Sequence, residues 1–488
     1  MTSIREIPDY SDLGKSDSIT KNAWEAILAK YDKYQYYYSG SVFREKVDDS
    51  ELIDPPSLYP VGINLVKMLC QSMAWSTFGE WDKMPVRWAT RHGIKESNST
   101  VEACKLMDDF LFRSNAESVF LQMEIQRMLL GASVIKVRPD LPSRGVSFHA
   151  IKPSSFFPVF DPHNPNRLLK AHVTSYLSRE QAKVLYDYQG KKDEVLFEEI
   201  WTLHEHKTIL DGKIVIKKYS GRNPYGLIPF VYIPRMRSVS EWGDSLAEDI
   251  IPVQDELNMR VADVGDAVNT NAHPIRWGKN LPNNFNTDNF PIGSDAFWDL
   301  GRSFGDSEPE VGALEIANPV PQGALDNISW LYDWVRTSTF APPIAFGEDN
   351  GGGQRSGVTL EIRMAPLIRA VRAHRAFMRT GLREVARISG TILRQKGFGV
   401  PVKVLDALIE AEVVPSFAEI MPRDRANLVD EVVKRLSTEP PTISLETALG
   451  ILGSDAIEDD RIDATIKKYG LDKKQEQTKK SDKEPKNG

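Results

Sequence analysis

The sequence is poor in the features that mark secreted and membrane proteins. Its 488 residues contain only two cysteines, Cys70 and Cys104, which argues against a disulfide framework and fits a reducing compartment. No apolar run reaches the roughly 20 residues of a membrane span, because Arg127 and Lys136 interrupt the run around Leu129. The first residues also lack the apolar core of a secretory signal. We therefore expect a soluble protein with no membrane partner.

Positive charge is also in short supply. Lys and Arg number 61 against 68 Asp and Glu, which gives the chain a formal net charge of -7. A protein that binds nucleic acid by neutralising phosphates usually carries the opposite excess. The balance therefore argues against an ordinary nucleic-acid-binding protein.

Motifs for nucleotide, metal and catalytic chemistry are incomplete. A glycine-rich loop at residues 347–357 precedes a long helix, yet Arg355-Ser356 follows its glycine triplet with no lysine, unlike a P-loop. His204 and His206 are expected on one face of a strand, which is half of a metal site with no further ligand nearby. No nucleophile, base and orienting residue are recognisable together. We expect no enzyme activity, no metal and no cofactor.

What is present is an ordinary globular composition, with 41% hydrophobic and 26% charged residues. A chain of this length is expected to form roughly two to four structural units. Apolar periodicity predicts helices at residues 19–39, 64–78, 100–113 and 116–130. From residue 133 the period changes to two, which predicts strands at 133–137, 146–151, 168–177 and 196–210, a short helix at 179–188, and a hairpin across Asp211-Gly212 to 213–219. The fold class is therefore α+β.

The centre of the chain is a predicted strand, residues 228–233, followed by an amphipathic helix. Ser245 and Glu248 predict a capping box at the helix start, and Pro252 is expected to kink or restart the helix. The apolar face comprises Leu246, Ile250, Val253, Leu257, Val261, Val264 and Val268. The other side is predicted to be an almost purely acidic stripe of Asp249, Asp255, Glu256, Asp263 and Asp266. Taken alone, such a helix simply faces water.

The second half of the chain continues with an insertion and three further helical regions. Residues 273–323 are rich in Gly, Pro, Asn and Asp and predict short strands and turns, after which the chain returns in a helix at 324–337. The longest helix, 358–396, should be kinked at Pro366. Beyond Gly399 the pattern is wholly helical, at 402–413, 423–436, 444–452 and 455–469, and the polar tail 471–488 is expected to be disordered.

One ridge of the longest helix is basic. Arg375, Arg379, Arg383 and Arg387 follow one another at spacings of four, so they share a helical face. Such a ridge can bind DNA or pair with an acidic surface. Because the chain as a whole is negative, we expect an ionic contact within the chain or, preferably, between subunits.

The order of these parts resembles the portal, or head-to-tail connector, proteins of tailed double-stranded DNA bacteriophages, specifically the siphovirus-type portal family. The resemblance covers roughly residues 60–460. Its most specific pieces are Gly243-Asp244-Ser245 at the start of the acidic helix and Ser356-Gly357-Val358-Thr359-Leu360-Glu361 at the start of the longest one. No single motif is diagnostic, and the ordered set carries the likeness.

The resemblance implies a ring of about twelve subunits at one capsid vertex, with each subunit divided into named parts. It implies an N-terminal arm (1–18), an α/β wing (19–244), a two-helix stem (245–272 and 324–340) and a small β-containing clip insertion (273–323). It further implies a tunnel loop (341–357), a long kinked wing helix (358–399), a helical C-terminal crown (400–470) and a disordered tail (471–488).

The resemblance also implies a function. The ring conducts DNA during packaging and ejection, and it docks the terminase, a head-completion or adaptor protein and the major capsid or scaffolding protein. The protein would be assembled in the host cytoplasm and reside in the virion. The stem carboxylates Asp255, Glu256, Asp263 and Asp266 would line the DNA channel, the tunnel-loop residues Asp349, Asn350, Gln354 and Arg355 would lie nearest DNA, and the basic ridge would join subunits.

A channel that lets DNA slide should not bind its phosphates tightly. Rings of carboxylates along the stem would repel the duplex and keep it centred and mobile, the inverse of a basic DNA-binding face. Two alternatives stay open at this point. One is another minor head or scaffold-type virion interaction protein, and the other is a nucleotide-binding enzyme that uses the glycine-rich loop.

Overall fold

The computed structural model describes two compact units, Met1–Ile420 and Met421–Gly488. The described residues are 17–42, 62–79, 86–212, 214–238, 241–272, 276–280, 310–313, 322–348, 357–418, 420, 433–435 and 437–438. In the second unit residues 433–435 are helical, within the helix expected at 423–436. The arm, the helices expected at 444–452 and 455–469 and the polar tail lie outside the described residues.

Four helices form the N-terminal half of the first unit, as the periodicity predicted. They are α1 (Asp17–Ser39), α3 (Leu65–Phe78), α4 (Asn98–Arg113) and α5 (Ala116–Leu130). Their ends carry local signals: the Asn64 side chain accepts a hydrogen bond from the Lys67 amide, and Ser97 forms a capping box with Thr100. Gly131, with φ +83°, follows α5 in the left-handed conformation that favours glycine.

The strands form two principal sheets. A three-stranded sheet has the order β10-β2-β3, and a six-stranded sheet has the path β4-β5-β6-β7-β8 with β9 paired to β7. All pairs are antiparallel, and β10 sets Tyr232 opposite Val134. Their bounds are β2 (Ala132–Asp140), β3 (Gly145–Ile151), β4 (Phe156–Asp161), β5 (Asn164–Ser178), β6 (Glu194–Thr202), β7 (Glu205–Leu210), β8 (Ile214–Val215), β9 (Gly221–Arg222) and β10 (Phe230–Pro234). The short elements η2 (Pro153–Ser155), α6 (Arg179–Tyr186) and η3 (Lys217–Tyr219) connect them.

Two expectations for this region need correction. The single strand predicted at 196–210 is wrong, because the chain turns after Thr202 and forms β6 and β7, which pair with each other. His204 lies in that turn, so it does not share a strand face with His206. The hairpin across Asp211-Gly212 is confirmed, because β7 pairs with β8 there and both residues have positive φ, 55° and 68°. Its second strand is shorter than the predicted 213–219, because β8 ends at Val215 and Lys217–Tyr219 form η3.

The expectation of a wholly helical chain beyond Gly399 is wrong as well. After α10 (Val402–Ile409), Ala411 takes a left-handed φ of 55°, and the chain then forms β13 (Val413–Phe417). This strand pairs with β1 (Val86–Thr90), which was not predicted either. Both strands are five residues long and gain their hydrogen bonds only from a partner more than 300 residues away in sequence, so periodicity alone could not find them.

Of the hydrophobic cores in the described part of the first unit, two are the largest. One joins α4, α5, the three-stranded sheet, α10 and the C-terminal part of α9 (Gly357–Lys396), with Phe120, Met378 and Leu408 fully buried. The other joins α1, α3, the end of α5 and two long helices, α7 (Ala247–Ala272) and α8 (Gln322–Ser338). The mixture of helix and sheet confirms the α+β class.

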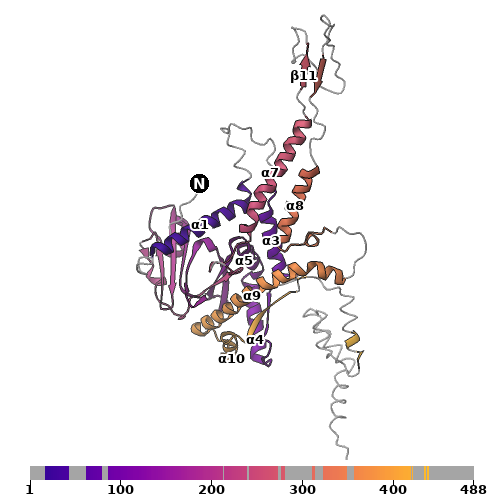
Figure 1. The fold of residues 1–488 in the computed structure, drawn as a ribbon. Helices are drawn as coiled ribbons and strands as arrows, with labels where there is room; N and C mark the ends of the chain where they lie inside the picture. The colour runs from indigo at the N-terminus through magenta and orange to yellow at the C-terminus, as the bar shows by residue number, and fades with distance from the viewer. Residues whose placement is uncertain are drawn as a thin grey trace, which may run out of the picture. The chain divides into compact units, whose positions relative to one another are not determined.

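The insertion between α7 and α8 is bracketed as predicted. Figure 1 shows α7 and α8 side by side, and Leu257 of α7 shares one hydrophobic core with Leu331 and Val335 of α8. Beyond them β11 (Arg276–Lys279) pairs antiparallel with β12 (Glu310–Ala313), and the residues between these strands lie outside the described part. The short helix η5 (Pro343–Phe346) then precedes α9.

Two local features of the long helices differ from the sequence prediction. Pro252 and Pro366 lie inside α7 and α9, so Pro252 does not restart α7, and the kinks expected at the two prolines stay predictions. The capping box is replaced by other contacts: Ser245 Oγ accepts from the Ala247 amide and donates to the Leu129 carbonyl, while Glu248 pairs with Lys30. The start of α7 is thus tied to α5 and α1. No helix of the described residues is long and apolar enough to cross a bilayer.

Candidate functional site

Asp255, in the N-terminal half of α7, is bound by a side chain of α1. The Tyr37 hydroxyl on α1 lies 3.0 and 2.8 Å from the two carboxylate oxygens of Asp255 and donates to them. Burial, and then this hydrogen bond to a negative group, raise the pKa of Tyr37 to about 12, so the hydroxyl stays a donor. Nearby, Gln254 Oε1 accepts from the Val66 amide at 3.0 Å. Asp255 therefore anchors α1 to α7.

The outer part of α7 carries the other predicted carboxylates together with one guanidinium. Arg260 Nε lies 2.8 Å from Glu256, and Arg260 Nη1 lies 3.6 Å from Asp263. Glu256, Arg260 and Asp263 follow one helical line, with side chains about half exposed, while Asp266 lies further along at intermediate exposure. The stripe is therefore acidic on balance but not purely so, and the prediction had overlooked Arg260.

Large apolar side chains are exposed on the same two helices. Trp330 and Trp334 lie one turn apart on α8 and are 60% and 45% exposed, and Leu325 is exposed on that helix too. On α7, Met259 and Val268 are each about half exposed. Apolar surface on this scale usually marks a contact with another molecule. The i, i+4 spacing of two tryptophans was available in the sequence and was not singled out.

The first member of the basic ridge is used inside the chain. Arg375 Nε donates to the Thr77 carbonyl at 2.6 Å, and the guanidinium lies over the Phe417 ring at 5.2 Å. Burial, and then the neighbouring Arg379 and Arg372, lower the pKa of Arg375 to about 10, which leaves it charged at neutral pH. Arg375 therefore joins α9 to α3 and β13.

The remaining members of the ridge are at or near the surface. Arg387 pairs with Glu384 one turn earlier on α9, with Nε to Oε2 at 2.8 Å. The Arg379 guanidinium carbon lies 5.8 Å from the centre of the Phe417 ring, and both Arg379 and Arg383 are exposed. The ridge thus divides into an inner residue, a locally paired residue and two residues that face outwards.

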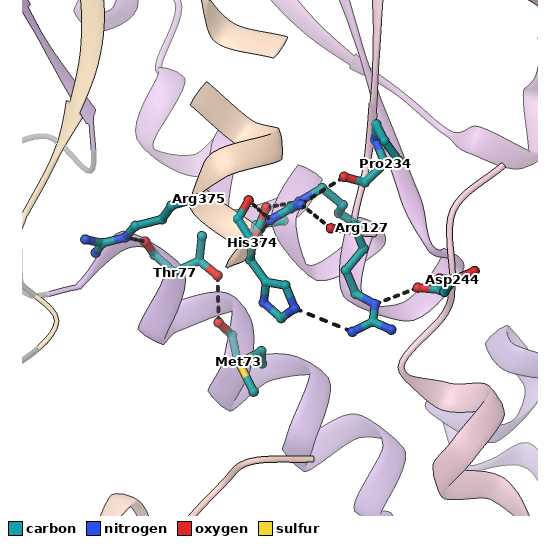
Figure 2. A network of polar contacts seen from close by, with 9 residues as sticks. Met73, Thr77, Arg127, Pro234, Asp244, His374 and Arg375 are labelled. Atoms are coloured by element: carbon teal, nitrogen blue, oxygen red, sulfur yellow. Dashed lines mark hydrogen bonds and ion pairs between the residues drawn. The ribbon is translucent and has the colours of Figure 1, made fainter. Parts of the chain in front are cut away.

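A buried polar network holds α5, β10, the start of α7 and α9 together (Figure 2). The Arg127 side chain is fully buried and forms two bonds to Glu124, with Nε–Oε2 at 2.7 Å and Nη2–Oε1 at 2.5 Å. Its Nη1 donates to the Pro234 carbonyl at 3.0 Å, and its Nη2 to the His374 carbonyl at 3.4 Å. A buried charge with this many partners fixes geometry rather than catalysing a reaction.

The second arginine of the network, Arg235, reaches the entry to α7. Its Nε donates to the Asp244 carbonyl at 2.5 Å, and its Nη1 lies 3.5 Å from His374 Nε2. Burial, and then the positive charges of Arg127 and Arg235, lower the pKa of His374 well below its usual value, so the imidazole is neutral. The sequence analysis did not identify this network, because Glu124 and Arg127 look like solvent-facing positions of a helix.

The segment before the glycine-rich loop is anchored to α8. Arg336 is buried and pairs with Asp333 and, at 2.5 Å, with Glu348, while its guanidinium lies 4.4 Å from the centre of the Tyr332 ring. The predicted tunnel-loop residues themselves lie outside the described residues: Asp349, Asn350, Gln354 and Arg355. Glu348, at the start of the loop, is thus held against the C-terminal end of α8.

The structure does not support a metal site at His204 and His206. His206 stacks on Trp201 with ring centres 4.7 Å apart, and His204 lies in the preceding turn. Among the described residues no group of three or more His, Cys, Asp or Glu is arranged to hold a metal ion.

A comparison with family models decides between the remaining alternatives. The model described as phage portal protein, SPP1 Gp6-like, matches residues 17–479. The chain belongs to the phage portal protein family. No curated protein matches it significantly. The portal protein is thus a structural component of the virion that serves DNA packaging and head–tail connection, and the resemblance seen in the sequence is confirmed over nearly the whole chain.

Proposed function

We propose that this portal protein forms a closed ring of about twelve subunits, joined in part through its two stem helices. The observation that carries the proposal is the exposed apolar surface of α8, where Trp330 and Trp334 project one turn apart. In a ring these side chains would pack on the stem of the next subunit, where Met259 and Val268 offer apolar surface. Burial of such side chains is worth about 1.5–3 kcal/mol each, repeated at every subunit boundary.

The charged face of α7 is proposed to line the DNA channel. Glu256, Asp263 and Asp266 then recur around the ring, and together with Arg260 they leave each subunit an acidic surplus. A wall of this sign repels the phosphates and leaves DNA free to slide. Asp255 would belong to the wing end of the channel, because Tyr37 already holds its carboxylate.

The other predicted surfaces receive their roles in the same proposal. The insertion 273–323 acts as the clip that docks the terminase during packaging and a head-completion or adaptor protein afterwards. The wing contacts the major capsid or scaffolding protein during assembly in the host cytoplasm. Arg379 and Arg383 contact an acidic surface of the neighbouring subunit, and the loop residues Asp349, Asn350, Gln354 and Arg355 lie nearest DNA.

Substitution of the stem tryptophans tests the ring. We expect Trp330→Ala combined with Trp334→Ala to shift the purified protein from rings to monomers or small oligomers, measured by light scattering and by electron microscopy. Trp75→Ala is the matched control, because Trp75 is also about half exposed but lies on α3 and not on α7 or α8. Circular dichroism establishes that each variant is folded. Rings in normal yield from the double variant would refute the proposed contact.

A further inference from the structure

A large groove lies between the two main sheets. This groove has a volume of about 980 Å³ and is bounded by β2 and β3 on one side and by β5, β6 and β7 on the other. Its volume is at the upper end of the roughly 300–1,000 Å³ of ordinary ligand sites. None of the proposed channel, stem or clip residues lines it, so it needs a separate explanation.

Aromatic side chains form the floor of the groove, and they stack on one another. The ring centres of His206 and Tyr225 lie 4.7 and 6.1 Å from that of Trp201, with nearly parallel planes. Tyr186 and Phe197 stack at 5.3 Å. Two rings therefore already stack with the Trp201 indole, and its Nε1 already donates to Glu199. A nucleic acid that stacks its bases on aromatic rings needs free ring faces, which this floor does not offer.

The rim of the groove is positively charged. Arg138, Lys152, Lys218 and Lys396 all line it and are exposed, and within the described residues no ion pair involves any of them. The one carboxylate that lines the groove, Glu199, is paired with Lys136. Four uncompensated cations in one groove contrast with the net charge of -7 of the whole chain.

Apolar surface continues outwards from the groove. Leu141 and Leu185 line it and are 65% and 55% exposed, and Tyr176 is about half exposed at its edge. These residues come from three separate segments, namely the turn after β2, strand β5 and helix α6. Exposed apolar side chains that gather at one groove are typical of a contact with another molecule.

We propose that this groove binds a peptide segment of a partner protein that carries several carboxylates and at least two large apolar side chains. The carboxylates meet the cations of the rim, and the apolar side chains cover Leu141, Leu185 and Tyr176. Charge complementarity of this kind selects the partner and speeds its association. The site is independent of the proposed ring contact, because it uses no residue of α7 or α8.

A selection from a displayed library of random twelve-residue peptides, made on the immobilised full-length chain, tests the proposal. Peptides enriched on the wild type are counter-selected on the variant R138E/K152E. The expected result is enrichment of acidic peptides with aromatic or large aliphatic residues on the wild type alone. In fluorescence polarisation, the best peptide should then bind the variant about tenfold more weakly, since two attractive charges have become repulsive. No differential enrichment, or enrichment of basic peptides, overturns the proposal.

Matched controls lie on the neighbouring helix α6. Leu185→Ala, which removes a lining residue, should weaken peptide binding, whereas Val184→Ala should not, because Val184 is exposed next to it but does not line the groove. Lys183→Glu is the control for the charge reversals, because Lys183 is exposed on α6 but does not line the groove. Equal losses in groove and control variants would mean non-specific attraction and would refute the site. Two further outcomes would overturn the proposal. Tighter binding of a single-stranded oligonucleotide, weakened by the same variants, would assign the groove to nucleic acid. Loss of peptide binding in assembled rings would assign it to a second copy of the chain.

Discussion

The guanidinium of Arg127 has no exposed surface, yet it contacts three parts of the portal protein that are far apart in sequence. Besides the carboxylate of Glu124 it binds the carbonyls of Pro234 and His374. Each of these bonds satisfies a polar group that would otherwise be buried without a partner. The residue therefore fixes where α9 lies against β10, and it does so through a charge that only Glu124 neutralises directly.

Removal of that carboxylate should be costly. We expect Glu124→Gln to destabilise the fold by about 3–5 kcal/mol, because Arg127 would remain buried without its counter-charge. The measurement is the urea midpoint of unfolding, followed by tryptophan fluorescence. Glu102→Gln, at an exposed position of the adjacent helix α4, should change stability by less than about 0.5 kcal/mol. Equal midpoints for the two variants would show that the buried Glu124–Arg127 pair contributes no more to stability than an exposed carboxylate does.

At the scale of elements, the sequence predicted what repeats locally and missed what depends on distant partners. The helices α3, α4, α5 and α9 were found within a few residues because each has a sustained apolar face. The pair β1–β13 was missed because neither strand is stable without the other, and the turn between β6 and β7 was missed because it contains no glycine or proline. Of the site, the carboxylates of α7 were predicted, but the partners Tyr37 and Arg260 required the fold.

The junction between α5 and α7 depends on two glycines that approach each other closely. Gly131 has φ +83°, and a Cβ placed on it would lie 2.6 Å from the Gly243 carbonyl oxygen. We expect Gly131→Ala to lose about 1–2 kcal/mol from the left-handed backbone alone, and a further loss from this clash. Gly212→Ala isolates the first contribution, because Gly212 has φ +68° with no atom within 4 Å of the added carbon. The two urea midpoints are compared.

If both alanine variants shift the midpoint equally, the close approach contributes nothing. A larger shift for Gly131→Ala supports a tight junction. At this junction Ser245 Oγ, just before α7, donates a hydrogen bond to the Leu129 carbonyl at 2.5 Å. The position of the stem helix would then follow from backbone packing in the wing and not from the helix itself.

At the scale of the whole molecule, a closed ring multiplies each surface feature by the number of subunits. In the proposed ring, the exposed tryptophan pair would form a contact repeated at every subunit boundary, and the acidic surplus of α7 would line the channel as rings of negative charge. This is why the family assignment changes the meaning of residues that look unremarkable in one subunit. It is also why the net charge of -7 does not argue against a protein that handles DNA.

If the acidic residues of α7 line the channel, the effect of a charge reversal there should depend on salt concentration. Asp263→Lys converts one carboxylate per subunit into a cation beside Arg260, at a half-exposed position that carries no core contact. Rings should still assemble, but DNA in the channel should move more slowly, because each ring of new cations attracts phosphates. Packaging and ejection rates should fall at low ionic strength and recover as salt screens the attraction over a Debye length of about 8–10 Å. Asp326→Lys, on the outer part of α8, is the control. Slowing that does not depend on salt, or an equal effect of the control, would mean that Asp263 does not face the DNA.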